Sequence, residues 1–230
     1  MNHTGRVVAI LLIEDDPLVR RGLELALHRH GHDVRTADTG EDGLREFHAS
    51  APDLVVLDLM LPGIDGFAVC RRIRAAGETP VIILTARGDD FDVIGGLEAG
   101  ADDYVVKPAQ PTVLDARIRA VLRRGTGTHG GVRVHRDLRI DTTALMVSLH
   151  GEQVRLTPTE LRLLLTLSRA PGRVFSRQQL LEEVWEHSYI GDSRLVDNCV
   201  QRLRAKIEAD PAVPEYVQTV RGFGYRFGPV

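Results

Sequence analysis

Residues 7–16, VVAILLIEDD, carry the clearest signal of the fold class of this chain. Its seven consecutive aliphatic residues, several of them β-branched, predict a strand that is buried on both faces. Three carboxylates follow the strand directly at 14–16, and apolar residues then recur at helical spacing from 18 to 27. A buried strand therefore leads through an acidic loop into a helix.

The same order of strand and helix recurs four more times. The predicted pairs are 33–37 with 40–49, 53–57 with 67–75, 81–84 with 89–99, and 104–106 with 112–124. Buried strands separated by helices predict a parallel sheet that is covered on both faces. Open sheets of this kind bind ligands at the carboxyl ends of their strands, so we expect the functional side chains there.

The length of 230 residues favours two domains. The glycine-rich stretch GTGTHGG predicts a linker at 125–131 between a first domain, 1–124, and a second, 132–230. Residues 1–124 contain 20 acidic and 15 basic side chains, whereas residues 125–230 contain 12 acidic and 14 basic ones. An acidic domain thus precedes a mildly basic one.

Composition excludes several classes of protein. With 43% hydrophobic and 27% charged residues and no apolar run near the ~18 residues of a membrane span, the chain resembles neither a membrane protein nor a disordered one. The N-terminal residues do not form a signal peptide, so we expect a cytoplasmic location. Cys70 and Cys199 lie far apart without ligand spacing, and we expect neither a disulfide nor a metal from them.

Acidic side chains occur at two of the predicted strand ends. Glu14 and Asp15 follow the first strand, and Asp58 ends the third. This pattern excludes a Rossmann or P-loop site, because such sites place a glycine-rich turn against the phosphate. Converging carboxylates repel one another unless a cation intervenes, and hard oxygen ligands suit Mg²⁺. The sequence therefore predicts a Mg²⁺ site.

Two further residues at strand ends suit a phosphoryl group. Thr85 offers a hydroxyl, and Lys107 offers a compact ammonium in a chain whose 29 basic residues include only one other lysine, Lys206. With these groups around it, Asp58 could attack phosphorus in line and form an acyl phosphate.

The motifs IEDD, PDLVVLDLMLPGIDG, ILTARG and ADDYVVKP resemble those of the two-component response regulators. The resemblance spans residues 7–124 and implies a flavodoxin-like receiver domain with five parallel strands. The implied roles are phosphoacceptor for Asp58, Mg²⁺ ligation by Glu14, Asp15, Asp58 and the backbone carbonyl of Met60, phosphoryl contact for Thr85 and Lys107, and an aromatic switch for Tyr104.

Two other interpretations stay open. One is a phosphatase or phosphotransferase with an aspartyl nucleophile, but hydrolases resembling the haloacid dehalogenases carry a general-acid Asp two residues after the nucleophile. Met60 stands at that position. The other is a receiver that acts as a phosphate-independent dimerisation module.

The second half has a different pattern. Short alternating stretches between 132 and 156 predict small antiparallel strands. Thr157-Pro158-Thr159-Glu160 predicts a capping box that starts a helix through Leu167, and further helices are predicted near 176–185 and 192–208. The stretch TVRGFGYRF, 219–227, predicts a strand pair with Arg221 exposed at its tip.

The predicted helix 192–208 has two distinct faces. Val196, Val200, Leu203 and Ile207 form one apolar stripe. The side chains predicted to face away from it are Arg194, Asn198, Gln201 and Arg202, with Arg204 and Lys206 on the flanks. Arginine, asparagine and glutamine carry the donors that base edges in the major groove accept, so this face favours DNA binding.

The motifs LTPTELRLL, SRQQLLEEVW, SRLVDNCVQRLRAKIE and VRGFGYRF resemble the α+β winged helix-turn-helix domain of OmpR/PhoB-type response regulators. The resemblance implies that Arg202 reads bases and that Arg221 enters the minor groove. It also implies phosphate contacts for Arg194, Arg204, Trp185 and Tyr225. Leu195 and Gln201 stand where many members carry Thr and Arg, so the target sequence cannot be copied from a relative. The loop Glu186–Gly191 would be available to RNA polymerase.

The resulting interpretation is a transcription factor and not an enzyme. A sensor histidine kinase would phosphorylate Asp58, and the receiver would then form a homodimer that aligns two winged helices on repeated half-sites of promoter DNA. Family members pair a basic residue of the fourth helix with a Glu of the fifth, and Val93 and Val113 match these positions here. The further candidates for ion pairs across the dimer are Glu98 with Arg119 and Asp103 with Arg117.

Overall fold

The computed structural model describes residues 7–85, 95–122, 131–185 and 193–228. The chain divides into two compact units, Met1–Val121 and Leu122–Val230. Residues 125–130 of the predicted linker lie outside the described ranges. Cys70 and Cys199 are buried in different units. No helix in the described part of the chain is long and apolar enough to cross a membrane.

The first unit contains a five-stranded sheet with the order β2-β1-β3-β4-β5, in which all neighbouring strands are parallel. This order confirms the predicted flavodoxin-like fold. The strands are β1 (Ala9–Ile13), β2 (Asp33–Ala37), β3 (Leu54–Asp58), β4 (Val81–Thr85) and β5 (Asp103–Val106). Every residue of β3 and β4 is buried, as the predicted apolar runs require.

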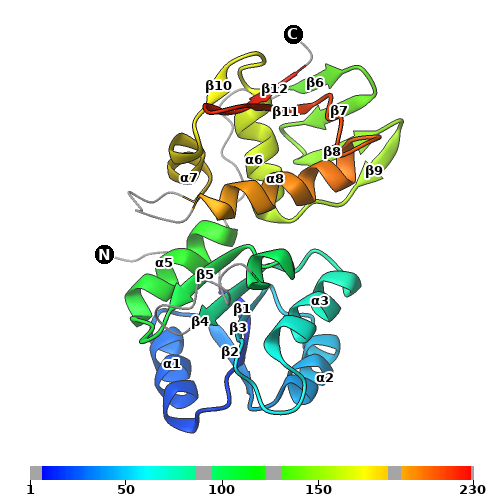
Figure 1. The fold of residues 1–230 in the computed structure, drawn as a ribbon. Coiled ribbons are helices and arrows are strands. Elements are labelled where there is room, and N and C mark those ends of the chain that lie inside the picture. Colours follow the sequence, from blue (N-terminus) through cyan, green and yellow to red (C-terminus); the bar gives the residue numbers. More distant parts are fainter. Residues whose placement is uncertain (1–6, 86–94, 123–130, 186–192, 229–230) are drawn as a thin grey trace. The chain divides into compact units, whose positions relative to one another are not determined.

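Helices cover both faces of this sheet. They are α1 (Pro17–Arg29), α2 (Gly40–Ser50), α3 (Gly66–Ala76) and α5 (Pro111–Leu122). Figure 1 shows α1 and α5 on one side of the sheet and α2 and α3 on the other. Of the predicted helix 89–99, residues 95–98 are helical and 89–94 lie outside the described ranges.

Polar side chains fix where the helices around the site begin. The Asp16 carboxylate accepts hydrogen bonds from the backbone N–H groups of Leu18 and Val19 at the start of α1. Asp65 caps α3 in the same way. The first residue of α3 must be a glycine, because a Cβ on Gly66 would lie 2.3 Å from the carbonyl oxygen of Asp58. The start of α3 therefore packs directly on the end of β3.

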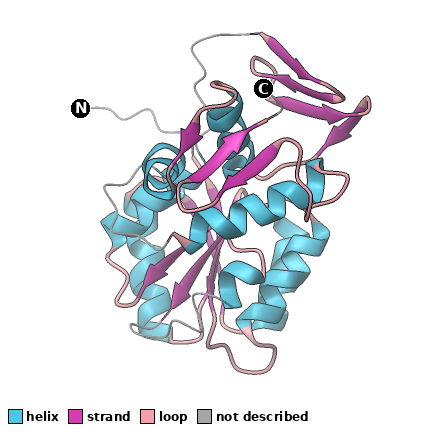
Figure 2. Cartoon of the chain, turned by 45° about the horizontal axis from the view of Figure 1, so that its top comes forward, coloured by secondary structure: helices cyan, strands magenta, loops and turns pink. Residues whose placement is uncertain are grey.

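The second unit combines two antiparallel sheets with three helices, coloured magenta and cyan in Figure 2. One sheet has the order β6-β7-β8-β9 and the other the order β10-β12-β11. The strands are β6 (Val132–His135), β7 (Leu138–Asp141), β8 (Met146–Leu149), β9 (Glu152–Val154), β10 (Val174–Phe175), β11 (Val217–Val220) and β12 (Gly224–Phe227). The helices are α6 (Pro158–Ser168), α7 (Arg177–Trp185) and α8 (Arg194–Ile207).

Local signals in this unit agree with the structure. The predicted capping box is present, with the Thr157 hydroxyl accepting from the Glu160 backbone N–H and the Glu160 carboxylate accepting from the Thr157 N–H. The predicted stripe of α8 is buried, since its four members are at most 1% exposed. Strands β11 and β12 form a hairpin whose turn contains exposed Arg221 and Gly222 at a φ of 79°.

Candidate functional site

Three carboxylates converge at the carboxyl ends of β1 and β3. Glu14 follows β1, and Asp58 is the last residue of β3. Ligand oxygens of Glu14, Asp15 and Asp58 all lie within 4.8 Å of one another. Glu14 and Asp58 are buried, whereas Asp15 is exposed. The parallel order of the strands thus brings together the acidic residues that the sequence places at separate strand ends.

The Lys107 ammonium lies against this acidic cluster. Its Nζ is 2.8 Å from Asp58 Oδ2 and 2.8 Å from Glu14 Oε2. The Lys107 backbone N–H donates to the carbonyl oxygen of Thr85 at 2.7 Å, so the residue after β5 is held against the end of β4. Thr85 is itself buried at that strand end. Residues from the ends of β1, β3, β4 and β5 therefore meet at one edge of the sheet.

In this cluster, burial and hydrogen bonding shift the pKa of each group in opposite directions. Burial raises the pKa of Glu14 and the nearby Asp58 charge adds to the rise, although hydrogen bonding to Lys107 lowers it. Burial by itself lowers the pKa of Lys107, but hydrogen bonds to Asp58 and Glu14 outweigh burial, and the pKa is raised overall. The ammonium is therefore retained at neutral pH.

The donor set fits a divalent cation. Three carboxylates face one ammonium, which leaves an excess of negative charge in a partly buried site. Carboxylate oxygens are the hard ligands that Mg²⁺ prefers. Within the described ranges, these three residues form the only such group of potential metal ligands.

The sequence did not point to Arg20, which supports the acidic loop. Its guanidinium donates to the carbonyl oxygens of Glu14 at 2.7 Å and Asp15 at 2.9 Å. An arginine in the first turns of a helix usually indicates a solvated surface, so only the fold reveals this contact. On the other side, the Met60 backbone N–H donates to Asp58 Oδ1 at 3.3 Å, and the Met60 side chain is 67% exposed.

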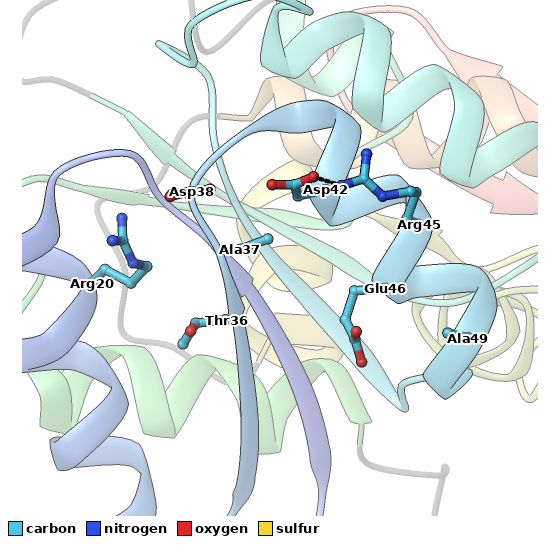
Figure 3. A pocket seen from close by; sticks show the side chains of 8 residues that line it. All are labelled: Arg20, Thr36, Ala37, Asp38, Asp42, Arg45, Glu46 and Ala49. Atoms are coloured by element: carbon cyan, nitrogen blue, oxygen red, sulfur yellow. Dashed lines mark hydrogen bonds and ion pairs between the residues drawn. The ribbon is translucent and has the colours of Figure 1, made fainter.

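A separate hollow of 480 Å³ lies beside this site, between Arg20 of α1, strand β2 and helix α2 (Figure 3). Two of its acidic side chains already have partners in the chain. Asp42 pairs with Arg45, and Glu46 pairs with Arg35 at 2.7 Å. The hollow therefore lacks the converging carboxylates that mark the site around Asp58.

The arginines of the predicted dimer ion pairs have carboxylate partners within their own unit. Arg117 binds Asp103 within the chain at 2.8 Å, and both side chains are buried. Arg119 pairs with Asp115, one turn earlier on α5. Arg117 is therefore already engaged inside its own unit, whereas the Arg119 side chain is 52% exposed and its contact with Glu98 across the dimer stays a prediction.

The other predicted dimer and switch residues differ in exposure. Val113 is 42% exposed on α5, so its side chain does not pack only inside its own unit. Glu98 is also exposed, and Val93 lies outside the described ranges. Tyr104, the predicted switch, is buried on β5 at 8% exposure.

Helix α8 presents part of the polar face expected of it. Gln201 is exposed, and Arg194 and Asn198 are half-buried. Arg202 is less exposed than predicted, because its Nε donates to the buried Glu160 of α6 at 3.3 Å, and its side chain is 17% exposed. Its predicted contact with bases stays a prediction. Trp185 is only 2% exposed, so its predicted phosphate contact would involve little of the ring and stays a prediction.

A polar network joins α7, α8 and the β11–β12 hairpin. The Tyr225 hydroxyl donates to Asp197 at 2.7 Å, and Arg177 Nε donates to the same carboxylate oxygen at 2.7 Å. Arg204 donates to the Val217 carbonyl oxygen at 2.8 Å. Sequence reasoning missed Arg177 and Asp197, whose pairing across twenty residues has no local signal. Phosphate contacts of Arg204 and Tyr225 stay predictions.

Comparisons with known proteins agree with this arrangement. Residues 10–119 match the response regulator receiver domain, and residues 151–227 match the C-terminal domain of transcriptional regulatory proteins. The transcriptional regulatory protein AfsQ1 of Streptomyces coelicolor is 62% identical over 96% of this chain and 98% of its own length. The DNA-binding response regulator MtrA of Mycolicibacterium smegmatis is 47% identical over 96% of both chains.

A solved structure extends the match to the fold. The response regulator DrrB, a Thermotoga maritima OmpR/PhoB homologue, is 39% identical, with a TM-score of 0.51 over 97% of this chain and 100% of that one. The chain therefore belongs to the response regulators of the OmpR/PhoB type. It is a transcriptional regulator of a two-component system and not an enzyme.

Proposed function

We propose that Asp58 accepts a phosphoryl group from a sensor histidine kinase and that this event controls binding of the chain to promoter DNA. The observation that carries the proposal is the position of Lys107 Nζ, 2.8 Å from Asp58 Oδ2 at the edge of an acidic cluster. In the transfer, an Asp58 oxygen bonds to phosphorus as the bond from phosphorus to the kinase histidine breaks. Lys107 and Thr85 would hold the phosphoryl oxygens.

Glu14, Asp15 and Asp58, together with the backbone carbonyl of Met60, would hold Mg²⁺. When bound, Mg²⁺ supplies positive charge that offsets the repulsion between the carboxylates and the phosphoryl oxygens. The chain's own contribution is to fix the position of Asp58, through the Met60 N–H and the Lys107 ammonium.

The second unit would bind DNA as part of a homodimer of phosphorylated chains. Exposed Val113 marks the proposed dimer face on α5, and exposed Gln201 and Arg221 mark the proposed DNA face. Two receivers in contact would align two winged helices on repeated half-sites, which raises affinity through avidity. The proposal places the protein in the cytoplasm with its DNA. The loop proposed for RNA polymerase, Glu186–Gly191, lies outside the described ranges.

Phosphorylation can be tested by intact mass after incubation of the full chain with acetyl phosphate and Mg²⁺. Wild type should gain one phosphoryl group and lose this ability when EDTA removes the metal. Asp58→Asn should gain none, because the variant keeps the shape of the side chain but lacks the nucleophile. Asp65→Asn is a matched control that should still gain one phosphoryl group. Its fold should be kept, since asparagine caps a helix about as well as aspartate.

Phosphorylation of Asp58→Asn to the same extent as wild type would contradict the proposal. A wild-type chain that binds promoter DNA equally with and without phosphorylation would instead favour a receiver that serves as a phosphate-independent dimerisation module.

A further inference from the structure

The carboxylate of Glu160 joins the first helix of the second unit to its proposed recognition helix. Glu160 belongs to α6 and is fully buried. Its Oε1 accepts from Arg202 Nε at 3.3 Å, and its Oε2 accepts from Lys206 Nζ at 2.7 Å. Both basic residues lie on α8, one turn apart. A single carboxylate thus holds two cations of the helix that is proposed to read DNA.

The same carboxylate also belongs to the capping box of α6. Its Oε2 accepts from the Thr157 backbone N–H at 3.0 Å, and the Thr157 hydroxyl accepts from the Glu160 N–H. The start of α6 therefore fixes the position of the carboxylate before any contact with α8 is counted. A helix cap on an exposed helix needs no such burial, so the buried position of Glu160 calls for another role.

Burial makes these contacts more specific than ordinary surface ion pairs. The Arg202 and Lys206 side chains are 17% and 24% exposed, whereas the Glu160 side chain is 0% exposed. Exposed ion pairs contribute little because water screens them and both side chains lose rotamer freedom. Here the glutamate is buried and bonded to the start of its own helix, and the cost of ordering the arginine is met in the unbound protein.

The geometry points to Glu160 as a positioning residue for base reading by Arg202. The bond to Glu160 uses the Nε–H, and guanidinium carries five N–H donors in one rigid plane. A carboxylate that holds Nε therefore sets the orientation of the whole plane, including the terminal nitrogens that can bind a guanine edge. This inference rests on the proposed DNA binding, and it adds a residue that itself contacts no DNA.

Glu160→Gln tests this role, because the variant separates positioning from capping. The amide oxygen of glutamine can still accept from the Thr157 N–H, so the capping box is retained. The amide nitrogen then faces Arg202 Nε, and two donors cannot bond. We expect the ratio of specific to nonspecific affinity to fall about fivefold or more in a chain that still folds, although loss of the buried charge lowers its melting temperature.

The measurement uses the full chain and two duplexes. One duplex is enriched from a random-sequence pool by the wild-type protein, and the other has the same composition in scrambled order. Arg202→Ala should lower the ratio by a similar factor, and the Glu160→Gln/Arg202→Ala double variant should lower it no further. Lys206→Met, which leaves the bond between Glu160 and Arg202 in place, should keep the wild-type ratio.

The possible failures are distinguishable. If the wild-type protein enriches no sequence, both the proposed DNA reading and this inference fail. If Arg202→Ala lowers the ratio but Glu160→Gln does not, or raises it, only the positioning role is overturned. If Glu160→Gln does not fold, Glu160→Asp withdraws the charge by one methylene group, and an unchanged ratio in that variant would overturn the inference.

Discussion

Lys107 and Lys206 each contact a glutamate that is fully buried, Glu14 in one unit and Glu160 in the other. All other basic residues of the chain except histidine are arginines. An ammonium is a compact charge with three donors, whereas a guanidinium is a wide planar fork. The two lysines thus occur where a small cation fits between or beside carboxylates.

Lys107→Arg should slow phosphorylation of Asp58 by acetyl phosphate about tenfold or more, which corresponds to ~1.4 kcal/mol of barrier. The wider guanidinium cannot take the place of an ammonium that lies 2.8 Å from both Asp58 and Glu14. Lys206→Arg is the control and should leave the rate unchanged. Equal rates for Lys107→Arg and wild type, measured by intact mass over time, would contradict this role of the lysine.

Gly66→Ala should destabilise the chain by about 1–3 kcal/mol in urea denaturation. The added Cβ would lie 2.3 Å from the Asp58 carbonyl oxygen and 2.5 Å from the Leu59 Cα, and backbone atoms cannot move aside cheaply. Gly22→Ala on α1 is the matched control. A Cβ there meets nothing within 4 Å, so alanine should stabilise that helix by up to ~1 kcal/mol. Equal stabilities of the two variants would refute the packing argument.

Tyr225 of β12 connects the β11–β12 hairpin to α8 through a hydrogen bond to Asp197. Burial and the hydrogen bond to Asp197 raise the pKa of Tyr225 from 10.0 to about 12. Below pH 10 the phenol is protonated in both folded and unfolded chains. Between pH 10 and 12 only the unfolded chain ionises, so the folded chain loses stability as the pH rises.

We therefore expect alkaline pH to cost wild type about 2–3 kcal/mol of stability through this group. Tyr225→Phe cannot ionise at this position and should lose less stability over the same pH interval, even if it is less stable at neutral pH. Urea midpoints of the second unit at about pH 9 and about pH 11.5 measure how steeply the stability of each protein falls with pH. The same loss of stability with pH in the variant and in wild type would contradict the role of Tyr225 ionisation.

In the proposed function, control of DNA binding depends on whether phosphorylated chains associate. Val113 is 42% exposed on α5, at the proposed dimer face. Val113→Glu should weaken the phosphorylated dimer about tenfold or more, because equal charges would meet near the two-fold axis. Val213→Glu is the matched control, since this valine is 71% exposed in the other unit. Sedimentation should show dimers for the control, and unimpaired dimers of Val113→Glu would exclude Val113 from the interface.

Much of the architecture could be predicted because it depends on the spacing of apolar residues along the chain. Apolar runs such as 81–84 and the stripe through Val196 and Leu203 specify which faces are buried, whatever the partner element is. Parallel strand order then requires that Glu14 and Asp58, at the ends of neighbouring strands, share one edge of the sheet. The acidic site follows from these two rules.

The partners of the long charged side chains, in contrast, depend on tertiary packing. Arg202 has the spacing of an outward residue, yet it bonds to Glu160, 42 residues earlier. Arg117 has the position of an interface residue, yet it is buried against Asp103. The physical reason is reach: an arginine side chain can turn toward any carboxylate within several ångströms, and those distances are set by packing between elements that are remote in sequence.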